Sequence, residues 1–135
     1  MADTVWIETL LAAWSAGDGD EVASYFAPDG VWEDVTMPFR HEGRAPIVDM
    51  WSRVPTEFSA DSQFEVANPV SDDDRYAFQW HWTGTHDASG CRFDICGASL
   101  GLRRGGLIVH HFDYWNPAQL AASGPICAAS CAGFQ

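Results

Sequence analysis

Lysine is absent from this chain, and positive charge of any kind is scarce. Seven Arg stand against nineteen Asp and Glu, which gives a formal net charge of −12 at pH 7. A surface of that sign repels the phosphates of nucleic acids and the headgroups of anionic lipids. We therefore expect neither a nucleic-acid nor a membrane partner, and we interpret most of the acidity, such as the three Asp at 72–74, as a solvated surface.

Long apolar segments are missing as well. No eighteen apolar residues follow one another, and the first residues lack the basic start and apolar run of a secretory signal. These absences predict a cytoplasmic protein. In a reducing cytoplasm the four Cys, which do not repeat a zinc-finger spacing, are expected to be free thiols.

Strings typical of metal sites are not found either. The chain contains no HxH and no HExxH. His81, His111 and Asp113 have side chains that suit a divalent metal if they converge, but nothing in their spacing requires one. We predict neither a metal nor a cofactor.

Aromatic residues, in contrast, are abundant. The 135 residues are 47% hydrophobic and 13% aromatic, with seven Trp, which is enough for a single domain to line a cavity as well as fill a core. We expect a hydrophobic small-molecule ligand. The candidate stacking wall is Trp14, Trp32, Trp51, Trp82 and Trp115, although an ordinary core role is as plausible for each one alone.

The apolar periodicity predicts helices first and a sheet afterwards. One helix runs from a cap at Asp3 to Gly17, a short one follows from a cap within 18–20, and a third has Pro46 in its first turn and Pro55 beyond its end. Strands are expected at 31–35, 63–70, 75–86, 91–102 and 107–115, the last four as an antiparallel meander. Helices segregated against such a sheet predict an α+β fold with one enclosed pocket.

The chain is expected to form one domain over residues 1–120. The remaining residues, 121–135, are small and weakly patterned, and we interpret them as a flexible tail that carries Cys127 and Cys131. A role for these two Cys stays open. One hypothesis makes the globular part a carrier for this tail.

The last strand, LIVHHFDYWNP, places polar residues within an apolar run. Alternate residues of a strand point to opposite sides, so His111, Asp113 and Trp115 share one face. An imidazole, a carboxylate and an indole together suit a functional site better than a plain core. His111 lies close enough to donate to Asp113 or to share a proton with it.

Several stretches together resemble a known family. These are AAWSAGDGDEVASYFAPDGVWED, RHEGRAPIVDMW, WHWTGTH and GLIVHHFDYWN, and they are similar to SnoaL-like polyketide cyclases and ketosteroid isomerases of the nuclear transport factor 2-like superfamily. The resemblance implies a cone-shaped α+β barrel, in which a curved sheet wraps over three helices and a deep pocket. It also implies frequent dimerisation, so we expect a homodimer.

The resemblance assigns roles to two carboxylates. Asp34, in the segment WED, falls where ketosteroid isomerases keep their general-base Asp. Asp113, in DYW, falls where SnoaL-like cyclases and limonene epoxide hydrolases carry an acid/base Asp. The oxyanion-binding pair of ketosteroid isomerases is replaced by Leu10 and approximately Ala98. The Arg and Asp of the hydrolases are not present in the strand segment QWHW.

Two further His are candidates. His81 is catalytic if its face of the strand at 75–86 lines the pocket, but alternation alone does not say whether that face or the face of Trp80 and Trp82 does so. His41 lies on the loop after Asp34 and could contact a polar end of the substrate, although loops are commonly polar without such a role.

The residues and the resemblance lead to one main hypothesis and one rival. The main hypothesis is a cofactor-independent isomerase, cyclase or dehydratase/hydratase, in which Asp34 and Asp113 divide acid and base roles and His111 and His81 set their protonation. The substrate is hydrophobic and cyclic or polyketide-like. The rival is a non-catalytic ligand-binding or dimerisation module with the same fold.

Overall fold

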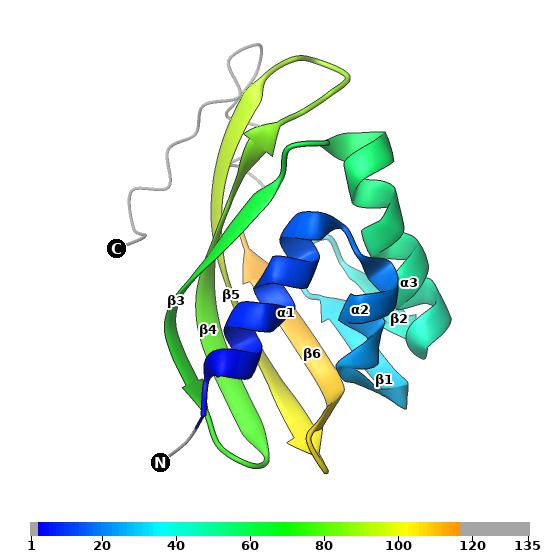
Figure 1. Ribbon diagram of the computed structural model, residues 1–135, viewed down its shortest axis with the longest axis vertical. Coiled ribbons are helices and arrows are strands. Elements are labelled where there is room, and N and C mark those ends of the chain that lie inside the picture. Colours follow the sequence, from blue (N-terminus) through cyan, green and yellow to red (C-terminus); the bar gives the residue numbers. More distant parts are fainter. Residues whose placement is uncertain (1–2, 117–135) are drawn as a thin grey trace.

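The computed structural model describes residues 3–116 and shows one curved sheet with helices on its concave side (Figure 1). The helices are α1 (Val5–Ala16), α2 (Gly19–Ser24) and α3 (Arg44–Arg53), the last continued by a π-helical turn (Val54–Phe58). The strands are β1 (Phe26–Asp34), β2 (Phe39–Glu42), β3 (Gln63–Ser71), β4 (Arg75–Thr85), β5 (Arg92–Arg104) and β6 (Leu107–Trp115). The expected cone-shaped α+β fold is therefore confirmed.

Local sequence explains the two N-terminal helices. The Asp3 carboxylate accepts a hydrogen bond from the first backbone N–H of α1 at 2.9 Å, and Asp18 accepts one from the N–H of Glu21 at the start of α2. Gly17 ends α1 with φ at +63°, in the left-handed region that favours glycine. The predicted apolar stripe of α1 is buried against the sheet.

Two elements differ from the prediction. The expected loop after Asp34 contains the short strand β2, which pairs with β1. The expected helix end before Pro55 is followed at once by the π-helical turn, which carries Pro55 near its start, where a missing N–H disturbs few helical bonds.

The sheet is mixed, in the order β2-β1-β6-β5-β4-β3. The predicted meander of β3, β4, β5 and β6 is antiparallel, whereas β1 lies parallel to β6. This parallel pairing joins the early WED segment to the late DYW segment and sets Asp34 beside Asp113. The sheet topology thus creates the neighbourhood in which the candidate site lies.

Three further predictions concern the tail, the Cys residues and membrane-spanning segments. The tail at 121–135, with Cys127 and Cys131, lies outside the described residues. Cys96 is disulfide-bonded, so the expectation of free thiols is wrong at that position. Within residues 3–116, no helix is both long and apolar enough to cross a bilayer.

Candidate active site

An aromatic cavity of about 240 Å³ lies between the helices and the sheet. Six of the seven Trp line it, including all five that the sequence predicted and also Trp80. The residues that line it are Trp14, Trp32, Asp34, Met37, Phe39, Met50, Trp51, Val54, Phe58, Phe64, Trp80, Trp82, Asp113 and Trp115. Within residues 3–116, the only charged side chains of the lining are the two Asp.

Asp34 and Asp113 are neighbours on adjacent parallel strands. Asp34 ends β1, and its register partner on β6 is Asp113. Residues in register on adjacent strands project from the same face, and adjacent strands lie about 4.8 Å apart. The two residues are 6% and 7% exposed, so both carboxyl groups are largely withdrawn from water. Two like charges so close together in an apolar cavity affect each other's protonation.

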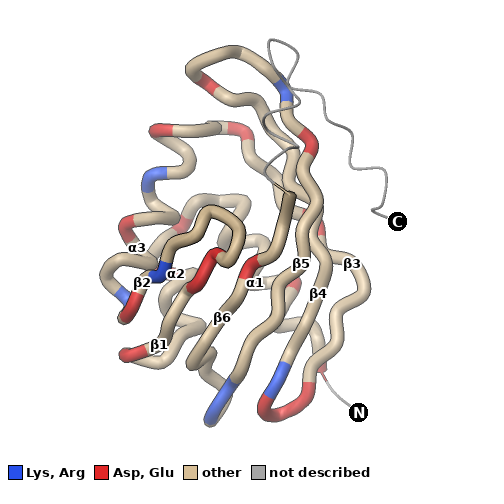
Figure 2. The backbone as a smooth tube through the Cα atoms, turned by 180° about the vertical axis from the view of Figure 1, so that it is seen from behind, with Lys and Arg blue, Asp and Glu red and all other residues tan. Residues whose placement is uncertain are grey.

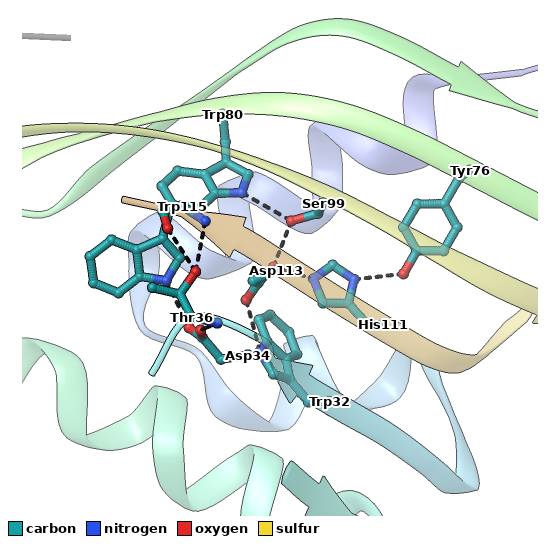
Figure 3. A network of polar contacts seen from close by, with 9 residues as sticks. All are labelled: Trp32, Asp34, Thr36, Tyr76, Trp80, Ser99, His111, Asp113 and Trp115. Atoms are coloured by element: carbon teal, nitrogen blue, oxygen red, sulfur yellow. Dashed lines mark hydrogen bonds and ion pairs between the residues drawn. The ribbon is translucent and has the colours of Figure 1, made fainter. Parts of the chain in front are cut away.

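Two indoles bind the carboxylates in a crossed pattern (Figure 3). Trp32, on β1, donates its Nε1–H to Oδ2 of Asp113 on β6 at 2.9 Å. Trp115, on β6, donates its Nε1–H to Oδ2 of Asp34 on β1, also at 2.9 Å. Each strand therefore holds the carboxylate of the other, which fixes both Oδ2 atoms at the cavity wall.

Backbone donors hold the second oxygen of Asp34. Its Oδ1 accepts from the N–H groups of Thr36 at 2.9 Å and Met37 at 3.0 Å, in the turn that follows β1. The Thr36 hydroxyl donates to the carbonyl of Trp115 at 2.7 Å and accepts from its N–H at 3.0 Å. Oδ1 is thus occupied twice and Oδ2 once, so Oδ2 keeps a lone pair for proton transfer.

A buried chain of side chains lies behind Asp113. Its Oδ1 accepts from the Ser99 hydroxyl at 2.6 Å and contacts Nε2 of His111 at 2.7 Å. Nδ1 of His111 contacts the Tyr76 hydroxyl at 2.6 Å, and Trp80 donates its Nε1–H to Ser99 at 2.9 Å (Figure 3). The indole can only donate, so the Ser99 hydroxyl proton is directed to Asp113.

The proton positions in this chain follow from its last member. Burial raises the pKa of Tyr76 well above its usual value of 10.0, and the charge of Asp113 adds to the effect. The phenol therefore keeps its proton and donates it to Nδ1 of His111. The remaining proton of a neutral imidazole then lies on Nε2 and is donated to Asp113.

Glycines on β5 make room for this arrangement. Gly97, Ser99 and Gly101 face inward at alternate positions. A Cβ at Gly97 would lie 2.1 Å from the Trp80 ring, and a Cβ at Gly101 would lie 2.3 Å from the Tyr76 hydroxyl. Side chains at 97 or 101 would displace these rings, so the strand must be bare there for Trp80 and Tyr76 to reach their partners.

Burial raises the pKa of Asp34 above its ordinary value of 3.8, and the charge of Asp113 raises it further, while the hydrogen bonds from Trp115, Met37 and Thr36 act in the opposite direction. The folded state thus binds this proton more tightly than the unfolded state. The corresponding stability is fully present below pH 3.8, the unfolded value, and is lost as the pH rises through the folded pKa.

The raised pKa of Asp34 predicts the outcome of a carboxyl titration. In carbon-detected NMR we expect Asp34 to titrate above 3.8, its ordinary value. The variant Asp34→Asn assigns the resonance. A midpoint for Asp34 at or below 3.8 contradicts the prediction.

The structure brings most of the predicted site residues together. Asp34 and Asp113 line the cavity, and His111 is fully buried behind Asp113. His111, Asp113 and Trp115 share the inner face of β6, as strand alternation predicted. These placements are structural and leave the chemical roles to be tested.

Two predicted residues are misplaced. His81 lies on the outer face of β4, where it pairs with Asp94, because Trp80 and Trp82 take the inner face. His41 lies on β2 beside the cavity without lining it, and its ring packs on Phe39 at 4.7 Å. Burial lowers the pKa of His41, which favours the neutral imidazole.

Sequence reasoning missed Ser99 and Tyr76. Position 98 was aligned with an oxyanion donor, but Ala98 faces outward opposite Tyr114, and Ser99 faces the site instead. Tyr76 is the second residue of β4, next to the acidic turn, and carries no local signal of its role. Within residues 3–116, no group of three His, Cys, Asp or Glu side chains is arranged to hold a metal ion.

The chain is similar to several solved structures of the same fold. A protein of unassigned function from Catenulispora acidiphila, with a ketosteroid isomerase-like fold and in complex with trimethylamine, matches with a TM-score of 0.83 at 18% identity, over 93% of this chain and 95% of that one. A proposed polyketide cyclase from Xanthomonas campestris matches with a TM-score of 0.76 at 20% identity, over 88% and 93%.

A limonene epoxide hydrolase-like enzyme from M. tuberculosis matches with a TM-score of 0.69 at 17% identity, over 83% of this chain and 80% of that one. At these identities the likeness shows the fold alone. No curated protein matches the chain. The model of the SnoaL-like domain matches residues 7–111, which cover most of the described fold and both Asp-bearing strands up to His111. The chain therefore belongs to the SnoaL-like domain family.

Proposed function

We propose that this protein is a cofactor-independent acid/base enzyme, of the isomerase, cyclase or dehydratase/hydratase type, acting on a hydrophobic cyclic or polyketide-like small molecule. The observation that carries the proposal is the pair Asp34 and Asp113, two neighbouring carboxyl groups in the wall of an otherwise apolar cavity. A buried pair of carboxyl groups, one of them with a raised pKa, is the kind of arrangement that acid/base catalysis uses.

The two carboxyl groups have different roles in this proposal. Asp34, whose pKa is raised by burial, donates a proton to an oxygen of the substrate. Asp113, which accepts hydrogen bonds from Ser99, His111 and Trp32, takes a proton from carbon. One proton leaves the substrate and one enters it, so the chemistry needs no redox partner.

His111 and Tyr76 act as positioning residues. Neither lines the cavity, and His111 reaches the reaction only through Asp113. Their hydrogen bonds hold the Asp113 carboxylate in one orientation. They also stabilise the carboxylate while its negative charge changes during proton transfer.

The size of the cavity narrows the substrate class. Pockets for drug-sized ligands commonly measure about 300–1,000 Å³, and this cavity of about 240 Å³ falls below that range. A compact molecule of one or two rings is therefore the best fit.

Proton exchange at carbon tests the proposal directly. Compact cyclic ketones such as 2-tetralone are incubated with the protein in D₂O, and deuterium incorporation next to the carbonyl is followed by proton NMR. We expect deuterium exchange to be faster in the presence of the protein than in matched protein-free buffer. A panel of such ketones that exchange at the buffer rate in spite of measurable binding would overturn the proposal.

The second candidate function is a non-catalytic ligand-binding module. It is favoured by the hydrogen bonding of the carboxyl groups, since each accepts three hydrogen bonds, which is also what purely structural Asp residues do. The neighbour that holds trimethylamine is an example of this fold with a small bound amine. Binding without any exchange distinguishes this candidate from the enzyme.

We also propose a homodimer formed through the outer face of the sheet. Val70, Leu100, Leu102 and Tyr114 are between 41% and 61% exposed, and strand pairing places the residues of β5 and β6 on the same outer side. The view from behind shows charged residues mainly at turns and strand ends (Figure 2). A second copy of the same face is a suitable partner for such a patch.

We expect the wild-type chain to elute as a dimer in size-exclusion chromatography with light scattering, and Leu100→Glu to elute as a monomer. Val5→Glu introduces the same charge at an exposed residue on α1, away from this face, and should leave the mass unchanged. A monomeric wild-type protein, or a dimeric Leu100→Glu variant, contradicts the proposed interface.

A further inference from the structure

The charge of the cavity is not balanced by a cationic side chain. All seven Arg of the chain lie within the described residues, and none of them lines the cavity. Arg40 pairs with Glu33 and Glu42, and Arg53 pairs with Asp49 and Glu57, all toward solvent. Asp34 and Asp113 therefore face an apolar space with no Arg beside them, and a buried carboxylate in that situation is costly.

The one basic group in contact with the pair is an imidazole. His111 bonds Asp113 through Nε2, while its Nδ1 faces a phenol that keeps its proton. An imidazolium would have a proton on Nδ1 pointing at the Tyr76 hydroxyl, whose own proton would then need another acceptor in a fully buried place. Both ring nitrogens of His111 are thus engaged, one by Tyr76 and one by Asp113, and within residues 3–116 no Arg lies beside the pair.

The cavity walls are rings, whose faces are electron-rich. Trp14 and Trp51 stack at 5.2 Å with planes 19° apart, and Trp32 meets Trp51 edge to face at 5.5 Å. Phe64 meets both Trp14 and Trp51 edge to face, so this part of the wall is one continuous cluster. An assembly of such faces attracts an organic cation, and the attraction grows when water is excluded.

The wall also contains hydrogen-bond donors without an acceptor. The indole N–H groups of Trp14 and Trp51 are buried and have no partner within residues 3–116, although both residues line the cavity. Buried donors are normally satisfied, and an exception calls for an explanation. An occupant with an acceptor oxygen beside its apolar part provides one after a small adjustment of the rings.

From these observations we propose that the cavity takes a compact organic cation, a tertiary or quaternary ammonium compound with an oxygen acceptor. As the substrate class of the acid/base site, this inference rests on the proposed function, but cation binding is testable by itself. The ammonium group lies against the indole faces and balances the charge of Asp113. The net charge of −12 attracts a cation and disfavours a carboxylate or phosphate ligand.

Three probes of one shape test the charge requirement. They are (3-hydroxyphenyl)trimethylammonium, its neutral isostere 3-tert-butylphenol, and the anion 3-hydroxybenzenesulfonate. Isothermal titration calorimetry on the wild-type protein should show the cation binding at least about tenfold tighter than the neutral isostere, in line with a desolvated cation–π site. The anion should bind more weakly than both.

Variants locate the preference in the cavity. Asp113→Asn should reduce the advantage of the cation over the isostere by about tenfold or more, since it removes the charge that faces the cation. Asp34→Asn, which replaces the carboxyl group that donates a proton in the proposed function, should reduce it less. Asp29→Asn removes one negative charge from an exposed position of the same strand and should leave the advantage unchanged. Near-ultraviolet circular dichroism shows which variants retain the folded aromatic cluster.

The outcomes separate this inference from the proposed function. Equal binding of the cation and the isostere to wild-type protein overturns the inference, whatever the variants do, and leaves the exchange assay with neutral ketones as an independent test of the enzyme. A cation preference that Asp29→Asn abolishes as strongly as Asp113→Asn also overturns it, because the preference then comes from general charge. Cation preference confined to the cavity Asp residues supports it, even if no ketone exchanges.

Discussion

Replacing Asp34 with Asn is expected to lower the rate of catalysed deuterium exchange by about 10²–10⁴-fold, the usual contribution of a positioned general acid or base. The amide keeps the volume of the carboxyl group but cannot give up a proton. Its NH₂ group also faces the Trp115 indole N–H, which needs an acceptor. Rates are measured by proton NMR in D₂O at fixed pH and saturating ketone.

Asp29→Asn is the matched control for this experiment, because it makes the same chemical change at an exposed position of β1. It should exchange at the wild-type rate. Asp113→Asn should lose as much activity as Asp34→Asn, and the double variant should lose little more, since the pair acts as a unit. Wild-type exchange by either single variant would contradict the division of roles.

Replacing Trp14 with Ala is expected to destabilise the fold by about 3–5 kcal/mol, the typical loss when a fully buried aromatic side chain is truncated. Trp14 is 2% exposed and lies at the centre of the aromatic cluster. Its ring is within 6 Å of the ring centres of Trp32, Trp51, Phe64, Phe78 and His111. Urea denaturation, followed by far-ultraviolet circular dichroism, gives the free energy of unfolding.

Trp82→Ala is the companion variant. Trp82 also lines the cavity, but it is only partly buried and lies at its margin, stacked on Phe64 and bonded to Ser62. Trp82→Ala should therefore lower the free energy of unfolding by less than Trp14→Ala does. If the two variants lose equal free energy of unfolding, Trp14 does not stabilise the aromatic cluster more than Trp82 does.

Local patterns were sufficient to predict most of the elements. Helix caps at Asp3 and Asp18 and the stop at Gly17 are short-range signals, and the four-strand meander has turns rich in Asp and Gly. The strand β2 was missed because four residues after a loop with Pro38 show no clear alternation. It forms because β1 offers it a pairing edge, which is a tertiary effect.

The site was predictable only where one strand carries it. Alternation along β6 placed His111, Asp113 and Trp115 on one face, and the family resemblance drew attention to Asp34. Alternation along β4 could not tell its inner face from its outer one, so the side on which His81 lies stayed open. That choice depends on which face the helices cover, and local sequence does not contain this information.

The crossed bonds between Asp34 and Asp113 and their indoles could not be predicted from sequence. They depend on β1 lying parallel to β6 in a fixed register, although the two segments are about eighty residues apart. Ser99 and Tyr76 belong to the same class of contacts, because their partners lie on other strands. Long-range strand pairing, rather than residue type, determines which side chains contact one another in this site.

The bare positions on β5 give separate control over two parts of the molecule. A residue larger than glycine at 97 would turn the Trp80 ring and so reshape the cavity, without replacing either Asp. A larger residue at 101 would instead move the Tyr76 hydroxyl away from His111, without replacing a residue that lines the cavity. The shape of the cavity and the buried contacts behind Asp113 can therefore be altered independently, by different single substitutions on one strand.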